Sequence, residues 1–221
     1  GGTPITGATN STYTPPTFNT TGTFYYYCVV SLSGNGCSDA ISNVAEIEVV
    51  DDPTVSSISP NYQQLCQSAT ISDITVVASG GVGTSYSYQW YSNTTNSNSG
   101  GTEITGATNT TYTPQTTTAG TTYYYCSIDL PQGGCNTIYS NTAEIIVNPD
   151  PTIDIHPISY QNICIDGNSQ QLNVSYIDGI GNPSYQWYSN NTNSNSGGTP
   201  ITGATNSTYT PPTFNTTGTF Y

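Results

Sequence analysis

The six cysteines are the side chains of this sequence that could most readily do covalent chemistry, and they recur at one interval. The pairs separated by 98 residues are Cys28 and Cys126, Cys37 and Cys135, and Cys66 and Cys164. None of them stands in a CxxC motif, the spacing typical of a structural zinc site, and the sequence has a single His. The cysteines therefore favour disulfide chemistry in an oxidising compartment.

This spacing leaves three arrangements of the thiols open. A β-hairpin centred on the segment SIDLPQGG would place the two cysteines that flank it opposite each other, close enough to form a bridge. The pairs with this spacing are Cys126 with Cys135 and Cys28 with Cys37. Alternatively, Cys66 and its equivalent Cys164 lie at the far end of their domains and form inter-domain bonds with the Gly-Cys of the next domain. Buried free thiols are the third arrangement.

Signals for catalysis or metal binding are few. The single His156, in IDIHPIS, lies on a predicted strand without an adjacent Ser or Cys nucleophile, so we expect no enzymatic activity and no organic cofactor. Asp51, Asp52 and Asp150 lie in predicted linkers, where oxygen ligands can bind calcium. Solvated turn residues are the default interpretation of these acids, and calcium is the alternative.

Two runs of three tyrosines, at 25–27 and 123–125, indicate an aromatic surface. Successive side chains of a strand point to opposite faces of the sheet, so Tyr123 and Tyr125 point outward if Tyr124 points into the core. Tyr91 on a neighbouring strand extends the same stripe. The stripe predicts either cross-strand pairing that stabilises the sheet or a sticky surface for glycans, abiotic surfaces or other filaments.

The charge composition excludes several classes of partner. The chain of 221 residues has 13 Asp plus Glu and no Lys or Arg, which gives a formal net charge of −13. Binding to nucleic acid or to an anionic membrane surface is therefore not expected. Nineteen Tyr, two Trp and four Phe supply the apolar surface that disordered chains lack, so we expect a folded protein.

Internal repeats define the organisation of the chain. Residues 1–25 recur without change at 197–221, and residues 88–114 return at 185–211 with three changes. Together with the 98-residue interval of the cysteines, this predicts a complete domain at 52–149. It also predicts the C-terminal part of a preceding domain at 1–50 and the N-terminal part of a third at 150–221. Acidic, Pro-containing segments at the boundaries read as short, stiff linkers.

The elements expected to position these side chains are short strands. Alternating or β-branched runs are separated by Gly, Asn, Ser and Pro clusters, and no stretch has helical periodicity. The predicted strands lie near 54–59, 70–79, 86–92, 102–105, 109–113, 121–129 and 138–147. About seven strands in about a hundred residues indicate an immunoglobulin-like β-sandwich. The fold class is therefore all-β, with tandem immunoglobulin-like sandwich domains in a head-to-tail array.

Several motifs resemble known families. Tyr88-Gln89-Trp90-Tyr91 is similar to the Trp motif of strand C in immunoglobulin domains, and Tyr124-x-Cys126 to the Tyr-x-Cys motif of strand F. This likeness implies core positions for Trp90, its counterpart Trp187, and Tyr124. The strand B cysteine of those domains would stand near Val76, so their usual disulfide is absent.

The combination of YQWY, a Gly-Ala-Thr-x-x-Thr-Tyr-Thr-Pro segment, GTxYYYC and a later Gly-Cys is more specific. It resembles the tandem immunoglobulin-like repeats of giant Bacteroidota surface adhesins, which include gliding-motility adhesins exported by the type 9 system. The resemblance implies a non-catalytic stalk or filament at the extracellular cell surface, with neighbouring repeats as its partners. The alternatives are a carbohydrate-binding array of a secreted protein, and assembly in which the incomplete domains of two copies complete each other.

Overall fold

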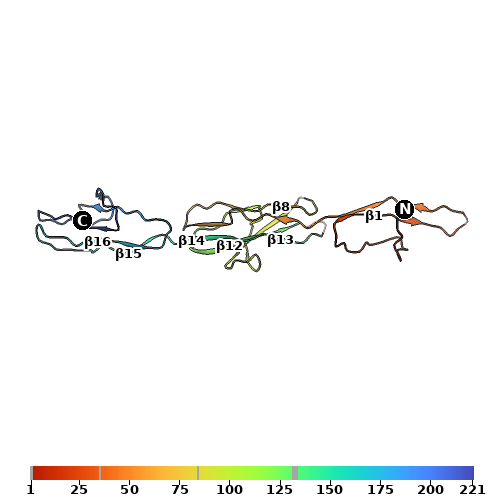
Figure 1. The fold of residues 1–221 in the computed structure, drawn as a ribbon, viewed down its shortest axis with the longest axis horizontal. Coiled ribbons are helices and arrows are strands. Elements are labelled where there is room, and N and C mark those ends of the chain that lie inside the picture. Colours follow the sequence, from red (N-terminus) through yellow and green to blue (C-terminus); the bar gives the residue numbers. More distant parts are fainter. Residues whose placement is uncertain (1, 35, 84, 131–133) are drawn as a thin grey trace.

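The computed structural model describes residues 2–34, 36–83, 85–130 and 134–221, and strands without helices make up the regular structure of this part of the chain. The strands pair within three groups, which we call the first unit (strands within 22–49), the middle unit (54–148) and the third unit (152–209). The three units follow one another in a row (Figure 1). No helix able to span a bilayer is found in the described residues.

The middle unit consists of two layers of strands. The larger sheet has the order β10 (Thr102–Glu103), β9 (Ser87–Asn93), β12 (Gly120–Asp129), β14 (Ala143–Asn148) and β6 (Tyr62–Cys66), and β13 (Ile138–Tyr139) also pairs with β12. The other layer comprises the pairs β5 (Thr54–Val55) with β8 (Ala78–Ser79) and β7 (Ile74–Thr75) with β11 (Thr111–Tyr112). The fold class is all-β and immunoglobulin-like, as the strand pattern predicts.

The first and third units contain two-stranded pairs. In the first unit the pairs are β1 (Gly22–Tyr26) with β4 (Ala45–Val49), and β2 (Val29–Val30) with β3 (Ala40–Ile41). In the third unit they are β15 (Thr152–Ile155) with β17 (Ser175–Ile177), β16 (Leu172–Asn173) with β20 (Thr208–Tyr209), and β18 (Tyr188–Ser189) with β19 (Thr199–Pro200). By the 98-residue repeat, the first unit corresponds to the last strands of the middle unit and the third unit to its earlier strands.

Strand β6 is absent from the sequence-based expectation, and it pairs in parallel with β14. The register places Tyr62 beside Glu144 and Cys66 beside Asn148. The Glu144 N–H donates to the Asn61 carbonyl and the Gln67 N–H to the Asn148 carbonyl, both at 2.9 Å, so the pairing is fixed at both ends. As a result, a strand from the early part of the unit lies beside its last strand.

The well-packed core lies between the two layers of the middle unit. It contains Ile58, Ile74, Val76, Trp90, Tyr124, Cys126, Ile128, Ala143, Ile145 and Val147. Inward side chains alternate along β14, where Ala143, Ile145 and Val147 are buried. In the first unit Val30 is 54% exposed, whereas its equivalent Ile128 in the middle unit is 0% exposed, since the strands that cover Ile128 have no counterpart in the first unit. Burial therefore differs between equivalent residues of the three units.

Candidate functional site

Trp90 is the centre of the middle unit. It lies on β9 opposite Cys126 of β12, and its side chain is 0% exposed. Its indole N–H donates to the Asn109 carbonyl at 2.8 Å, and its ring stacks on Tyr112 with centroids 5.9 Å apart. Tyr124, which the sequence also places in the core, is buried beside it. These residues hold the two layers together.

Trp187 repeats this arrangement in a more open setting. Its indole N–H donates to the Asn206 carbonyl at 2.9 Å, and its ring lies 5.9 Å from that of Tyr209. Unlike Trp90, it is only half-buried. The local contacts of the motif therefore form in the third unit without the strands that bury the tryptophan in the middle unit.

The tyrosines of the aromatic stripe pack against one another rather than forming an exposed binding surface. The rings of Tyr91 and Tyr125 stack with centroids 5.0 Å apart and 7° between their planes, and Tyr139 lies 6.3 Å from Tyr125. Tyr125 is only 3% exposed, and its hydroxyl accepts the Gly101 N–H at 3.1 Å. Tyr125 thus lies on the face away from the core, as predicted, but it is covered rather than exposed, because the loop after β9 folds over this face of the sheet.

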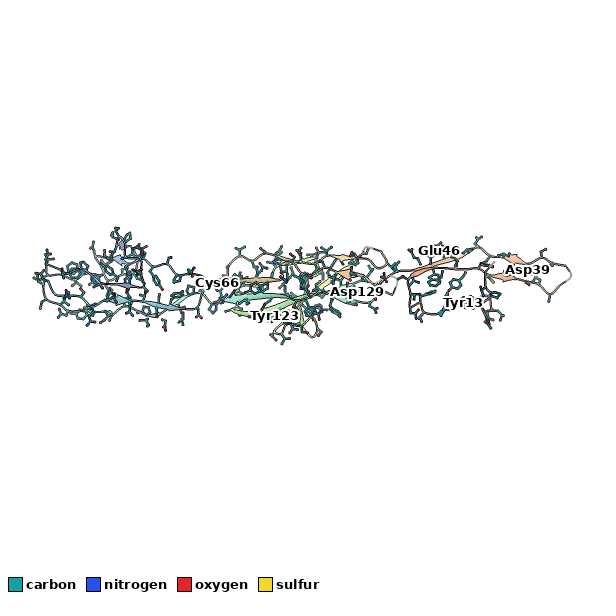
Figure 2. All side chains as sticks on the ribbon, in the orientation of Figure 1. Tyr13, Asp39, Glu46, Cys66, Tyr123 and Asp129 are labelled. Carbon is teal, nitrogen blue, oxygen red and sulfur yellow. The ribbon has the colours of Figure 1, made fainter. Side chains whose placement is uncertain are left out.

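Tyr91 and Tyr123, the other two predicted binding aromatics, are half-buried. The Tyr123 hydroxyl donates to Glu144 Oε1 at 3.1 Å, and this hydrogen bond to the carboxylate is the main cause that raises the pKa of Tyr123. Figure 2 shows Tyr123 on the middle unit, toward its end near the third unit. Cross-strand pairing, the structural alternative for the stripe, accounts for these contacts.

The loop of residues 94–101 is held by uncharged side chains. Asn93 Nδ2 donates to the carbonyls of Ser97 and Ser99, each at 3.1 Å, and Asn98 Nδ2 donates to the Ser140 carbonyl at 2.9 Å. In the third unit Asn190 Nδ2 repeats the first two bonds. The signal for this loop was the recurring motif Tyr-Ser-Asn-x-Thr-Asn-Ser-Asn-Ser-Gly-Gly, which sequence reasoning recorded as a repeat but did not assign a role.

The register of the β12–β13 hairpin separates the cysteines that were expected to form a bridge. Ser127 pairs with Tyr139, and the Ser140 N–H donates to the Cys126 carbonyl, so Ser140 is the residue opposite Cys126. Cys135 lies five residues before Ser140, outside the paired residues of β13, so it does not face Cys126. Cys28 likewise faces Ser42 rather than Cys37. The predicted hairpin disulfides, Cys126 with Cys135 and Cys28 with Cys37, are therefore not formed in this register.

The six thiols differ in their surroundings, and all six are free in the structure. Cys126 is completely buried, and desolvation raises the pKa of its thiol to about 12. Cys66 and Cys135 are half-buried, whereas Cys28, Cys37 and Cys164 are exposed. Since the thiolate is the reactive form, Cys126 is the least reactive of them.

The linker acids do not gather into a metal site. Asp52 accepts hydrogen bonds from the Asn136 N–H at 3.3 Å and from Asn136 Nδ2 at 3.0 Å. The bond from the Asn136 side chain is the first cause that lowers the pKa of Asp52. No group of three or more His, Cys, Asp and Glu suited to a metal ion occurs within the described residues, Asp51 and Asp150 included. The Asp52 bonds tie the linker to the segment that follows the β12–β13 turn.

His156 follows β15 in an exposed position. It takes part in none of the side-chain hydrogen bonds between described residues. The contacts described above are packing and hydrogen bonds at the faces of the sheets and near the junctions between units.

Comparisons with known proteins complete this description. No curated protein matches the sequence. Two solved structures are similar at low identity: immunoglobulin domains 1–5 of Sidekick-1, with 13% identity and a TM-score of 0.40, and extracellular domains 3–5 of Drosophila OTK, with 18% identity and a TM-score of 0.30. The matches cover 72% and 70% of this chain but 33% and 48% of those chains. The sequence profile of a domain of unknown function, DUF8696, matches residues 55–149 and 157–221, so the chain belongs to this family.

Proposed function

We propose that the chain is a segment of an extracellular stalk or filament and that its role is mechanical. The observation that carries this proposal is the path of the polypeptide, which enters the middle unit at one end and leaves it at the other, so that successive units follow in a row (Figure 1). The resemblance of the repeat motifs to giant Bacteroidota surface adhesins supports a place at the cell surface and export by the type 9 system. In this proposal the partners are neighbouring repeats.

The parallel pairing of β6 with β14 fits a load-bearing role. Both strands run toward the third unit. A pull on the two ends of the middle unit draws the start of β6 toward the first unit and the end of β14 toward the third unit. The force then acts along the strands, so the hydrogen bonds between them are loaded together rather than opened one at a time. The proposed stalk is therefore strongest along its own axis.

Replacing Gln67 with Pro is expected to lower the force at which the middle unit unfolds. Proline has no N–H, so the 2.9 Å bond from Gln67 N to the Asn148 carbonyl is lost. The measurement is single-molecule force spectroscopy on the full chain held by its two ends. Loss of one hydrogen bond lowers the free energy of unfolding by about 1 kcal/mol at equilibrium. If the β6–β14 pair carries the load, the unfolding force falls by more than this loss of stability alone would cause.

Gln67→Ala is the matched control. It keeps the backbone N–H and removes the side-chain bond from Gln67 Nε2 to the Thr117 carbonyl, which Gln67→Pro also removes. The proposal expects the alanine variant to keep nearly the wild-type unfolding force. Equal forces for the proline variant and the wild type would argue against load transfer through this strand pair.

A carbohydrate-binding array, the other function that the sequence suggests, needs an exposed aromatic platform. Tyr91 and Tyr125 stack on each other, and the loop of residues 94–101 covers Tyr125. The observation that would favour glycan binding is thus missing from the face where it was expected.

A further inference from the structure

Two half-buried cysteines lie at opposite ends of the middle unit, each at a junction with a neighbour. Cys66 ends β6 and lines a groove together with Pro151, Ile153 and Gly179 of the third unit. Figure 2 shows Cys66 at the end of the middle unit that faces the third unit. Cys135 lines a second groove, at the junction with the first unit. Each thiol therefore faces a different neighbour.

The surroundings of Cys66 within its own unit are well defined. Cys66 pairs with Asn148, and the next residue donates its N–H to the Asn148 carbonyl. The Ser68 N–H donates to the Thr116 carbonyl at 2.9 Å, and Gln67 Nε2 donates to the Thr117 carbonyl at 3.1 Å. The segment that contains this cysteine is thus held by the backbone carbonyls of Asn148, Thr116 and Thr117, which we call its docking site.

Residues equivalent to this docking site are present in the first unit. Counting back 98 residues along the repeat, the equivalents of Asn148, Thr116 and Thr117 are Val50, Phe18 and Asn19. These three residues line the groove that contains Cys135. The thiol equivalent to Cys66 in the unit that precedes the middle unit would accordingly lie in the groove of Cys135.

The junction with the third unit shows which part of a following unit would approach Cys66. In the middle unit, the loop that contains Gly81 lies against Leu130 at the end of β12, since a Cβ on Gly81 would lie 2.6 Å from Leu130 Cδ2. The equivalent loop of the third unit contains Gly179, which lies in the groove of Cys66. In a following unit, the residue equivalent to Leu130 would therefore lie near Cys66.

Asp52 keeps the Cys135 segment in place at its junction. It accepts two hydrogen bonds from Asn136, the residue next to Cys135. The linker and the cysteine segment are therefore held together before any covalent bond forms. By contrast, Cys126 faces the core and lies opposite Ser140, so it has no route to either junction.

We propose that the cysteine at the end of β6 in each unit forms a disulfide with the Gly-Cys of the unit that follows, which links the units covalently along the axis. The oxidant is a disulfide compound such as oxidised glutathione. Two protein thiols lose two protons and two electrons and form one S–S bond, while the S–S bond of the oxidant is reduced to two thiols. The inference rests on the proposed end-to-end function only in requiring that units follow one another.

The test uses the full chain extended at its C terminus by a second copy of residues 26–50. Residues 197–221 repeat 1–25, so this extension continues the repeat and completes the third unit. After oxidation with oxidised glutathione, pepsin fragments are mapped by mass spectrometry without reduction. The acid conditions of pepsin digestion suppress thiol exchange, and trypsin is unsuitable because the chain has no Lys or Arg. We expect a bond between Cys66 and the appended copy of Cys37.

Two matched variants accompany the extended chain. Cys66→Ser is expected to abolish the bond, whereas Cys126→Ser is expected to leave it intact. Burial of Trp187, which shifts its fluorescence to the blue, reports that the extension has folded onto the third unit. A folded extension in which Cys66 stays a thiol, or in which the appended copies of Cys28 and Cys37 bond to each other, would overturn the proposal.

The unextended chain gives a second measurement. Here Cys66 and Cys135 lie at opposite ends of one unit without their partners, so oxidation is expected to yield mixed disulfides with glutathione at these two positions, as at the exposed Cys28, Cys37 and Cys164. A bond between Cys126 and Cys135, or between Cys66 and Cys135, within one chain would contradict the proposal. The force measurement on Gln67 variants involves no cysteine chemistry, so failure of the disulfide and failure of the stalk function are distinguishable.

Discussion

Replacing Trp90 with Ala is expected to lower the free energy of unfolding of the middle unit by about 3–5 kcal/mol. The side chain is completely buried, so its removal leaves a cavity between the two layers of strands. The Asn109 carbonyl also loses the indole N–H that donates to it. Because a domain of this size has a total stability of about 5–15 kcal/mol, the variant loses a large share of it. Urea denaturation of the full chain followed by circular dichroism measures the change.

Trp187→Ala is the control, since it removes the same residue type from the same motif. Trp187 keeps the indole bond to the Asn206 carbonyl and the contact with Tyr209, but it is only half-buried. Its removal should therefore cost well under half as much and leave the main unfolding transition near that of the wild type. Equal losses for both variants would show that burial between the layers is not what distinguishes the two tryptophans.

Replacing Tyr125 with Thr is expected to destabilise the middle unit by about 3 kcal/mol. The substitution removes a ring that stacks on Tyr91 and a hydroxyl that accepts the Gly101 N–H. The loop of residues 94–101 then loses the surface on which it lies. Thermal unfolding and hydrogen exchange at Gly101 measure the two effects.

Tyr27→Thr tests whether the cost comes from burial. Tyr27 is the equivalent of Tyr125 in the first unit, and its hydroxyl accepts the Gly2 N–H at 3.1 Å, but the residue is 45% exposed compared with 3% for Tyr125. We expect its replacement to have little effect on unfolding. If Tyr125→Thr were as mild as Tyr27→Thr, the aromatic stripe would have to be regarded as a surface feature after all.

The sequence was informative where a local pattern determines the environment. Alternation along 121–129 placed β12, and the run 138–147, expected as one strand, is divided into β13 and β14. The Trp and Tyr motifs pointed to Trp90 and Tyr124 as core residues. The segment Tyr62–Cys66 was missed, because YQQLC has no β-branched residue and its pairing with β14 is made by backbone groups. The predicted domain boundaries at residues 50–52 and 149–150 stay predictions.

The errors concern features that depend on register or on distant segments. The hairpin bridge assumed a turn midway between Cys126 and Cys135, but Ile138 and Tyr139 pair with β12 and shift the register toward Ser140. Tyr125 was expected on the surface because alternation says which face a side chain points to, but not whether a loop covers that face. An inter-domain bond of Cys66 was one of the three arrangements that the sequence left open, but the residues of the third unit that line its groove became known only from the structure.

The way in which the loop of residues 94–101 is held has a consequence for the solvents the protein tolerates. Its bonds join amides, hydroxyls and carbonyls, and the sequence has no Lys or Arg with which its acids could form ion pairs. Dissolved salt weakens attraction between opposite charges, which this chain nearly lacks, and it also weakens the repulsion among acidic groups. Added salt should therefore stabilise rather than destabilise the folded chain, and its rigidity should be undiminished at the ionic strength of seawater.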